Sequence, residues 1–330
     1  MRRMILVLVI SAVLLTSCAY EESYSDIAAQ RIPVPYITVL DGGIYEIIDG
    51  SVYRGEETIL DGGEYGLYVT GITGWRDRLY FLYSDNEAGN HFLCRIGSVK
   101  PGKKPRLNLF KSVLDYAAAA GFTPGGLPNN LGLIRVVDGV LLISGDYYAS
   151  PCAAIEISTG RGCIFGTPSP DYVEPFIMYL GSEAFCVESQ PGQIYLRSYD
   201  VHGLAGGKRA SERASDSLTE DHDGGGIISA AAAPDGAIYF TAGHSPGRYG
   251  IFRVKRKERQ YPENELIYET SDRITAVFTR GDRLFFSTAD AVYHLEDGEA
   301  VYFCAAAEKN FRPFFVMNRL YIGRDEYIET

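Results

Sequence analysis

Short apolar segments, most of which contain an aromatic residue, recur along the whole chain. Each follows a Gly, Asp or Asn turn, and similar apolar segments lie before and after it. Short runs of β-branched and aromatic residues between such turns predict β-strands. The recurring segments are "RDRLYFLYS" (76–84), "DGVLLISG" (138–145), "GSEAFCVES" (181–189), "DGAIYFTAG" (235–243), "GDRLFFSTA" (281–289) and "MNRLYIG" (317–323). The pattern therefore predicts a repeating unit of several short antiparallel strands.

A unit of four short strands every roughly 40 to 50 residues is typical of a β-propeller blade. Five complete units fit between Tyr65 and Ala307, and the segment 42–55 has the pattern of the last two strands of a blade. We therefore predict an all-β fold, a β-propeller with six blades whose ring the N- and C-terminal strands close. Seven blades remain possible if Tyr36–Leu40 and Tyr327–Glu329 form strands of their own. Two tandem β-sandwiches are the alternative architecture.

One segment favours a helix within this all-β pattern. Val113–Ala120 is rich in alanine and could form about two helical turns before Gly121 and Pro124 end them. We expect this helix to cap one face of the ring or to dock beside a blade.

The first residues of the chain do not follow the strand pattern. Arg2 and Arg3 precede an uninterrupted apolar run, Ile5–Leu15, and small residues follow it. This is the layout of a secretory signal peptide, and the apolar run is too short to span a bilayer. We therefore expect these residues to be removed from the folded protein.

The segment Leu15-Thr16-Ser17-Cys18 resembles the lipobox of bacterial lipoproteins at every position of that motif. The resemblance implies cleavage before Cys18 and acylation of this cysteine, and each buried methylene adds about 0.8 kcal/mol of membrane affinity. The predicted organisation is a signal peptide over 1–17, a lipidated tether over 18–35 and the propeller over 36–330. The predicted location is the cell envelope, on the outer membrane in a diderm bacterium, since no aspartate follows Cys18.

Composition and charge agree with this interpretation. The chain has 36 Gly, 24 Tyr and 16 Phe, which favour turns and strands. Its formal net charge is −11, and removal of the signal peptide takes away Arg2 and Arg3, which makes the remaining chain more acidic. An acidic surface disfavours non-specific nucleic-acid binding, so we expect no nucleic-acid partner.

Five cysteines remain beside Cys18. Cys152 and Cys163 could form a disulfide, but a hairpin that turns at Thr159-Gly160 places Cys163 opposite Ile157, beyond disulfide reach of Cys152. The other cysteines lie in apolar segments and are expected in the core: Cys94, Cys186 and Cys304.

The segment "GHSPG" (243–247) has the G-x-S-x-G spacing of a serine-hydrolase nucleophile elbow. That elbow requires a helix directly after the serine. Here the apolar segment "IFRVKR" follows, which predicts a strand. We therefore interpret Ser245 as part of a hairpin connection and not as a nucleophile.

The segment Gly97–Lys104 has the glycine and lysine positions of a P-loop. Lys104 stands where that motif requires Ser or Thr, and Pro101 and Pro105 oppose a following helix. A solvated hairpin loop is the better interpretation.

Two charged clusters complete the candidate motifs. Glu220–Asp223 could supply metal ligands, but it ends a polar insertion, 202–226, that we expect to be a solvated loop. The basic run 255–260 is expected at a hairpin tip. We therefore predict no metal site in either cluster.

The connections between the second and third strands of the predicted blades emerge on one face of a propeller. Polar and aromatic residues there suit recognition of a protein or glycan. The candidates for this binding face are Asp85, Asn86, His91, Tyr147, Tyr148, His244, Arg248 and Tyr249.

The repeats resemble bacterial propeller lipoproteins, in the broad company of NHL-, YncE- and PQQ-like repeats, and "APDGAIYFTAGHSPGRYGIFRV" (233–254) is the most NHL-like unit. The lipobox, the repeat and the failure of every catalytic motif together favour a non-enzymatic binding or scaffolding module in the envelope, anchored to the membrane at Cys18 and without a cofactor. A PQQ-like cofactor is not expected, because Trp75 is the single tryptophan. The alternative function is a propeller hydrolase or lactonase with a metal in the central channel, although the predicted inner strands carry almost no carboxylates.

Overall fold

The computed structural model describes residues 33–85, 95–119, 131–145, 152–165, 176–180, 183–190, 193–206, 212–220, 227–254, 264–309 and 311–330. These residues form an all-β structure with short helices between some of the strands. The described strands make seven antiparallel sheets, and in each sheet the strands pair in the order of the sequence.

The strands of the first three sheets are β1 (Ile37–Leu40), β2 (Gly43–Ile48), β3 (Ser51–Arg54) and β4 (Glu57–Leu60); β5 (Leu67–Trp75), β6 (Arg78–Asp85) and β7 (Arg95–Val99); and β8 (Leu131–Val137), β9 (Val140–Gly145), β10 (Cys152–Glu156) and β11 (Gly162–Phe165). The next two sheets are β12 (Phe176–Leu180), β13 (Glu183–Gln190), β14 (Gln193–Asp200) and β15 (Glu212–Glu220); and β16 (Ile227–Ala232), β17 (Ile238–Ser245), β18 (Arg248–Val254) and β19 (Glu265–Thr270). The last two are β20 (Ala276–Arg280), β21 (Arg283–Ser287), β22 (Ala291–Glu296) and β23 (Glu299–Ala305); and β24 (Phe314–Val316), β25 (Arg319–Tyr321) and β26 (Tyr327–Glu329). The helices are α3 (Gly62–Tyr65), α4 (Val113–Ala119) and α5 (Val201–Ala205).

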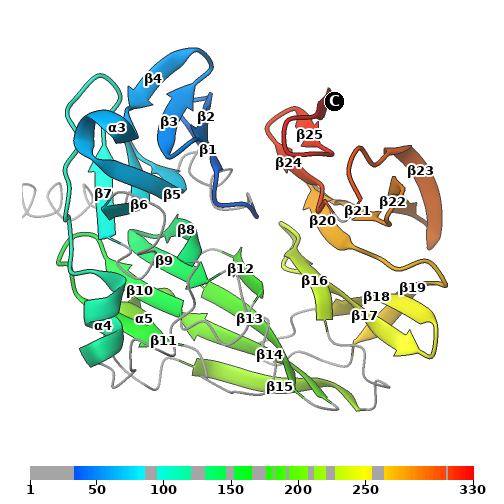
Figure 1. The fold of residues 1–330 in the computed structure, drawn as a ribbon. Helices are drawn as coiled ribbons and strands as arrows, with labels where there is room; N and C mark the ends of the chain where they lie inside the picture. Colours follow the sequence, from blue (N-terminus) through cyan, green and yellow to red (C-terminus); the bar gives the residue numbers. More distant parts are fainter. Residues whose placement is uncertain are drawn as a thin grey trace, which may run out of the picture.

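The sheets follow one another around a common centre, with the first strand of each sheet innermost and the last outermost (Figure 1). The first strands of neighbouring sheets contact each other: β1 contacts β5, β5 contacts β8, β12 contacts β16, and β16 contacts β20. Each sheet also shares a cluster of buried apolar side chains with the next one along the chain. The core is therefore divided into a series of clusters between sheets.

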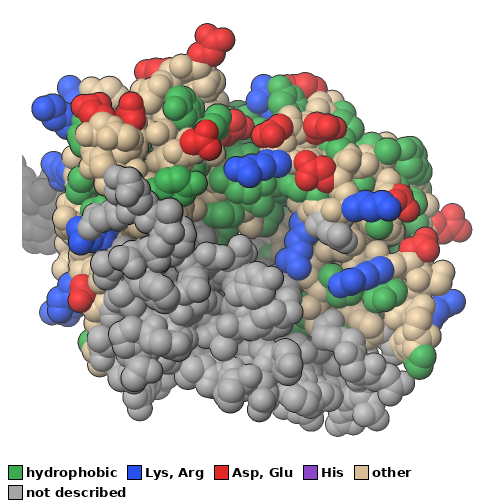
Figure 2. Space-filling view, in the orientation of Figure 1, with side chains coloured by type: hydrophobic (Ala, Val, Ile, Leu, Met, Phe, Trp, Pro, Cys, Tyr) green, Lys and Arg blue, Asp and Glu red, His purple; other side chains and the backbone are tan. Residues whose placement is uncertain are grey.

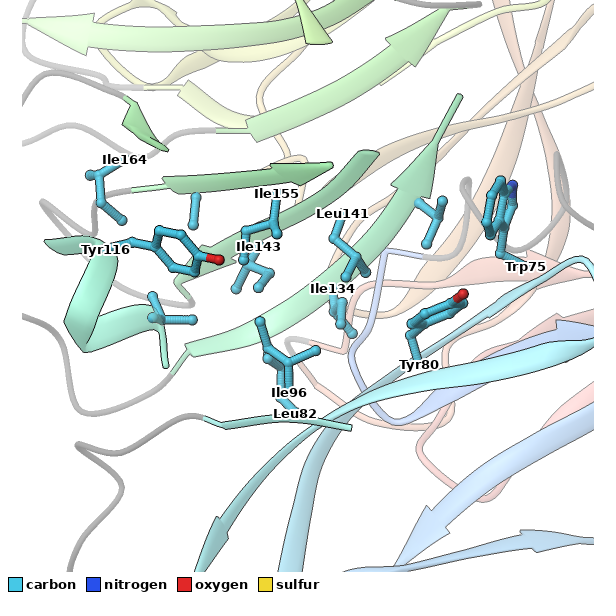
Figure 3. Close-up of a cluster of buried hydrophobic side chains, with 13 residues drawn as sticks. Trp75, Tyr80, Leu82, Ile96, Tyr116, Ile134, Leu141, Ile143, Ile155 and Ile164 are labelled. Atoms are coloured by element: carbon cyan, nitrogen blue, oxygen red, sulfur yellow. The ribbon is translucent and has the colours of Figure 1, made fainter. Parts of the chain in front are cut away.

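The cluster between β5–β7 and β8–β11 illustrates this packing (Figure 3). Leu82 and Ile96 from the earlier sheet face Ile134 and Ile143 from the later one, and Tyr116 of α4 covers the outer part of the cluster. Alternate positions of the strands point to opposite sides of a sheet, so each sheet contributes to a cluster on both faces. This explains why the strands are apolar at most positions.

The last and the first sheets also share a cluster. Phe314 and Tyr321 pack against Ile37 of β1. The Tyr321 hydroxyl donates a hydrogen bond to a carboxylate oxygen of Glu46, with an O···O distance of 3.2 Å. Side chains that are far apart in the sequence therefore join the two ends of the described chain.

We expected the N- and C-terminal strands to complete one sheet, and this prediction is wrong in its pairing. β1 pairs with β2, whereas β24–β26 form a sheet of their own. The reason is the two-residue turn at Asp41-Gly42, where φ is 48° and 70°. Two positive φ values are typical of the tight hairpin turn that fixes the second strand beside the first. Tyr327–Glu329 is likewise a strand, β26.

Small and hydroxyl side chains hold the inner strands together. The amide of Gly74 in β5 donates to Thr38 Oγ1 in β1 at 2.8 Å, and the amide of Val277 in β20 donates to Ser229 Oγ in β16 at 3.1 Å. A Cβ atom at Gly74 would lie 2.1 Å from the carbonyl oxygen of Val39. The inner strands therefore need small residues because their backbones approach closely.

Helix α4 confirms the predicted helix. Its first turn is held by Ser112, whose backbone and hydroxyl both donate to Asp115. These hydrogen bonds lower the pKa of the Asp115 carboxyl. The Tyr116 hydroxyl donates to the carbonyl of Gly160 at 2.8 Å, so the helix docks beside the β8–β11 sheet.

The polar insertion 202–226 is more ordered than we predicted. It begins with α5 and contains the nine-residue strand β15, which pairs with β14. An outermost strand needs only one paired neighbour, and its residues need not be apolar. The polar composition of this segment is therefore the reason that the sequence did not predict β15. The segments 221–226 and 255–260 lie outside the described residues.

The cysteine hairpin has a different register from the predicted one. Cys163 lies opposite Ala154, two residues from Cys152, because the turn is longer than the predicted one. The Cys163 thiol is free, as is that of Cys304, and burial raises the pKa of the Cys304 thiol. Cys186 lies in β13, and Cys94 lies outside the described residues.

Candidate functional site

The predicted binding face consists of the connections between the second and third strands. Of the predicted residues, Asn86, His91, Tyr147 and Tyr148 lie outside the described residues. For Asp85 at the end of β6 and His244 in β17 the structure gives the backbone position. Arg248 and Tyr249 are described in full, and the β17–β18 connection is therefore the part of this face that can be examined in detail.

The β17–β18 connection is a tight hairpin. Ser245 pairs with Arg248, and Gly247 occupies the turn with a φ of 72°. The chain continues directly into β18, so the helix that a nucleophile elbow requires is replaced by a strand. Our interpretation of Ser245 as a hairpin residue is confirmed, and its side chain is exposed.

The segment with P-loop spacing is also a hairpin. β7 ends at Val99, Gly102 has a φ of 74°, and Arg106 returns to pair with Ser98 through two backbone hydrogen bonds of 2.7 and 2.9 Å. This confirms the predicted loop and shows why the spacing of glycine and lysine there has no phosphate-binding geometry.

Arg248 is the exposed charged residue of the β17–β18 hairpin. Its Nη2 atom donates to Oε2 of Glu269 in β19 at 2.6 Å, and about half of its side chain is exposed. The hydrogen bond and the negative charge of Glu269 raise the pKa of the Arg248 guanidinium. A guanidinium has five N–H donors in a fixed plane, so this orientation leaves donors directed to solvent.

Tyr249, the next residue, lies partly in the apolar core. Its side chain is half-buried and packs against the apolar cluster between the β16–β19 and β20–β23 sheets. It pairs with Thr270 of β19 in the backbone register. Tyr249 therefore packs the hairpin against the core, while the Arg248 side chain on the other side of the hairpin contacts solvent.

The inner strands of neighbouring sheets run parallel, which places corresponding connections at the same end of the molecule. The amide of Ile72 donates to the carbonyl of Pro35, and the amide of Gly74 donates to the hydroxyl of Thr38. Residue numbers therefore rise in the same direction along β1 and β5. Ser229 and Ala232 bond to Val277 and Thr279 in the same way. We call the end that holds the β17–β18 hairpin the loop end.

Other exposed side chains at the loop end come from the first and last sheets. Tyr68 at the start of β5 is 45% exposed, and its ring packs against the Gly50 turn. Arg324, in the β25–β26 connection, lies over the Tyr36 ring at 5.6 Å. Sequence reasoning missed Tyr68, although it stands between the apolar residues Leu67 and Val69 at the start of β5, and this alternation is the signal that could have identified it.

Acidic side chains are frequent on the face in view in Figure 2. They gather over the first sheet and over the sheets β20–β25, with lysine and arginine among them. At the loop end, Glu64 in α3 and Asp290 in the β21–β22 connection are exposed acids. The described part of this end therefore offers mixed hydrogen-bonding groups with exposed tyrosine, which suits recognition.

Arg135 is the second residue that sequence reasoning missed. It lies on the inner strand β8 and is fully buried. Its Nη2 atom donates to the carbonyl of Val34 at 3.0 Å, and its Nη1 atom donates to the carbonyl of Ile134. A buried charge requires such partners. Arg135 therefore fixes the start of the described chain against the third sheet.

Within the ranges that the structure describes, no group of three or more His, Cys, Asp or Glu side chains is placed to hold a metal ion. Glu220 ends β15, and the rest of the predicted acidic cluster lies outside those ranges. Among the described residues, no helix combines the length and the apolar character needed to cross a membrane.

Comparison with known proteins identifies the type of fold. No family model matches the chain, and no curated protein matches it. Among solved structures, a prolyl endopeptidase aligns over 91% of this chain and 45% of its own, with a TM-score of 0.51 and 13% identity. A puromycin-hydrolyzing peptidase of Mycobacterium tuberculosis aligns over 90% and 44%, with a TM-score of 0.50 and 11% identity. The chain thus spans less than half the length of these proteins, and the likeness shows an all-β, propeller-type fold.

Proposed function

We propose that this chain is a lipid-anchored β-propeller of the cell envelope that binds an envelope protein or glycan through its loop end. The proposal combines the signal peptide and lipobox at Cys18 with a propeller-type body. The feature that carries it is the loop end, where the Arg248–Glu269 pair and exposed Tyr68 offer polar and aromatic contacts. Aromatic and arginine side chains are the residues that most often dominate binding surfaces.

The proposed ring has seven blades, one more than the number we favoured from the sequence. Seven sheets form in the described residues, and the cluster of Phe314, Tyr321 and Ile37 joins the last sheet to the first. Packing of this kind supports a closed ring, in which short outer strands are the remaining sheet edges.

The anchor is tested by metabolic labelling with an alkyne-tagged fatty acid. We expect the wild-type chain to be labelled and to fractionate with membranes, because the thiol of Cys18 is the acylation site that the lipobox implies. Cys18→Ser should lose the label and the membrane association. Cys304→Ser is the control and should keep both. Label that persists in Cys18→Ser contradicts the anchor.

Binding at the loop end is tested by site-specific photocrosslinking in envelopes. A benzoylphenylalanine at position 68 or 248 should form the same discrete adduct. Arg283 is the control position, because it is exposed at the start of β21, next to the β20–β21 turn at the opposite end of the molecule. Equal adducts from position 283 would contradict a specific loop-end partner. Co-sedimentation of the purified chain with peptidoglycan sacculi distinguishes a glycan ligand from a protein.

A further inference from the structure

The last sheet lacks an outer fourth strand in the described part of the chain. Five of the seven sheets have four strands. In the β5–β7 sheet the fourth position is partly filled, because Arg106 pairs with Ser98 and Leu109 bonds to Ile96. The β24–β26 sheet ends at β26, and no described segment pairs with the outer edge of that strand.

Part of the β26 backbone points to this edge, where no strand among the described residues pairs with it. The amide of Thr330 donates to the carbonyl of Asn318 at 2.7 Å, and the amide of Ile322 donates to the carbonyl of Glu326 at 2.9 Å. In an antiparallel pair, bonded and non-bonded positions alternate. Ile328 therefore bonds towards β25, whereas the amides and carbonyls of Tyr327 and Glu329 point away from it.

Apolar side chains are left exposed on the outer strand of the neighbouring sheet. On β23 of the preceding sheet, Val301 is 38% and Phe303 is 37% exposed. The Phe303 ring lies 5.5 Å from Phe285, which in turn lies 5.0 Å from Phe315 of β24. Phe303 is therefore the outermost ring of the cluster between the last two sheets.

A complete pair of sheets shows what is missing. Between β16–β19 and β20–β23, the fourth strand of the later sheet, β23, contributes Ala300 to the shared cluster, and its Tyr302 ring lies 6.1 Å from that of Tyr293. No described segment has the corresponding place beside β26. We call the outer edge of β26 together with Val301 and Phe303 the fourth-strand slot.

The outer strand β23 has little of the usual protection of a sheet edge. Natural edge strands carry charges or are covered. β4 carries Glu57 and β19 carries Glu265 and Glu269, while α4 and α5 contact β11. β23 has a charge only at its first residue, Glu299, and residues 300–307 contain neither a charge nor a proline.

We propose that the fourth-strand slot binds an extended segment of a partner protein, with apolar residues at alternate positions and basic residues at its ends. The backbone of this segment pairs with Tyr327 and Glu329, and its apolar side chains cover Phe303. Strand addition to an open sheet edge is an established mode of peptide recognition. Exposed acids lie at both ends of the slot, Glu299 at one end and Asp325 and Glu326 at the other. In a chain of net charge −11 they favour a basic segment.

The proposal is tested with a fluorescein-labelled peptide, acetyl-Lys-Val-Thr-Val-Arg-Val-Lys-amide, added to the full mature chain. Binding is measured by fluorescence anisotropy. Phe303→Lys should weaken binding at least tenfold, because it removes the apolar contact and adds a like charge. The matched control is Leu266→Lys, on the outer strand of a complete sheet, where the leucine is 40% exposed. A peptide of equal charge with proline at its centre should not bind, since it cannot pair as a strand.

A second variant keeps the test valid if Phe303→Lys impairs folding. The same strand sequence is appended after Thr330 through an Asn-Gly turn, so that it fills the slot from within the chain. This variant should raise the unfolding temperature and abolish binding of the free peptide. If the appended strand leaves peptide binding intact, or if Leu266→Lys weakens it as much as Phe303→Lys does, the proposal is wrong.

Two other occupants would also overturn it. Sedimentation velocity detects a second copy of this chain, which would appear as a dimer that Phe303→Lys dissociates. Occupation by the chain's own tether would appear as peptide binding only after removal of residues 19–32. The features that carry this inference, Phe303 and the outer edge of β26, are not among those that carry the proposed function, so failure of either test leaves the other intact.

Discussion

Tyr321 joins the two ends of the described chain at the level of a single side chain. Its ring stacks on Phe314 with centroids 5.2 Å apart, and its hydroxyl donates to Glu46. Burial, followed by the negative charge of Glu46, raises the pKa of Tyr321 to about 12. The native state therefore holds this proton more tightly than the unfolded chain, whose tyrosine pKa is about 10.

This difference predicts a loss of stability at high pH. The contribution of Tyr321 is fully present below pH 10 and is lost as pH rises from about 10 to 12, because the native state must give up a proton it favours. Urea unfolding should show a steeper fall of the free energy of unfolding in that window for the wild type than for Tyr321→Phe. Burial also raises the pKa of other tyrosines, among them Tyr80 and Tyr116, so part of the fall should persist in the variant. Parallel curves for the two proteins would contradict this assignment.

Gly74 shows a second constraint at the residue scale. Its Cα lies so close to β1 that a Cβ atom would meet the carbonyl oxygen of Val39 at 2.1 Å. Gly74→Ala should lower the free energy of unfolding by about 2 kcal/mol or more, since backbone must move to relieve the clash. Thermal unfolding followed by circular dichroism measures the loss. The control is Gly63→Ala in α3, where the nearest atom is a side-chain oxygen of Asp61 at 3.3 Å; an equal loss there would show that the close approach is not the cause.

At the scale of elements, the sequence predicted the short strands and their turns well, because alternation and turn residues are local signals. The recurring segment 76–84 became β6, 138–145 became β9 and 281–289 became β21. The pairing of the chain ends was predicted wrongly, since it depends on the Asp41-Gly42 hairpin, which competes with any long-range partner for β1. β15 was missed because an outer strand can be polar. In the candidate site, Arg248 was found from its place in a hairpin, whereas the buried state of Arg135 depends on contacts that no local pattern encodes.

Helix α4 permits a test of docking at the element scale. It is anchored to the β10–β11 turn by the hydrogen bond from Tyr116 to the Gly160 carbonyl. Tyr116→Phe keeps the ring but removes the donor, so it should cost about 1 kcal/mol and loosen the helix. Hydrogen exchange of residues 113–119 should become faster, while exchange in β20–β23 stays unchanged. Faster exchange throughout the chain would mean that the bond supports the whole fold and not this helix alone.

The arrangement of the whole molecule rests on clusters between successive sheets, each of which couples two neighbours. An array of that kind unfolds from its ends unless the last unit packs on the first, because an end unit has one stabilising interface while an internal unit has two. The cluster of Phe314 and Tyr321 with Ile37 supplies this additional interface. It is therefore the part of the structure on which the proposed closed ring depends.

Phe314 tests that closure directly. Its side chain is 1% exposed, and it packs between the last and the first sheets. Phe314→Ala should lower the free energy of unfolding by about 3 to 5 kcal/mol, as buried phenylalanines commonly do. It should also increase hydrogen exchange at both ends, in β1–β2 and in β24–β25, because opening the interface releases both partners. Phe303→Ala is the matched control: this residue is 37% exposed at the outer rim of the neighbouring cluster, and its truncation should cost much less. If Phe314→Ala accelerates exchange in β24–β25 but leaves β1–β2 protected, the first sheet does not depend on the last, and the ring is not closed by this contact.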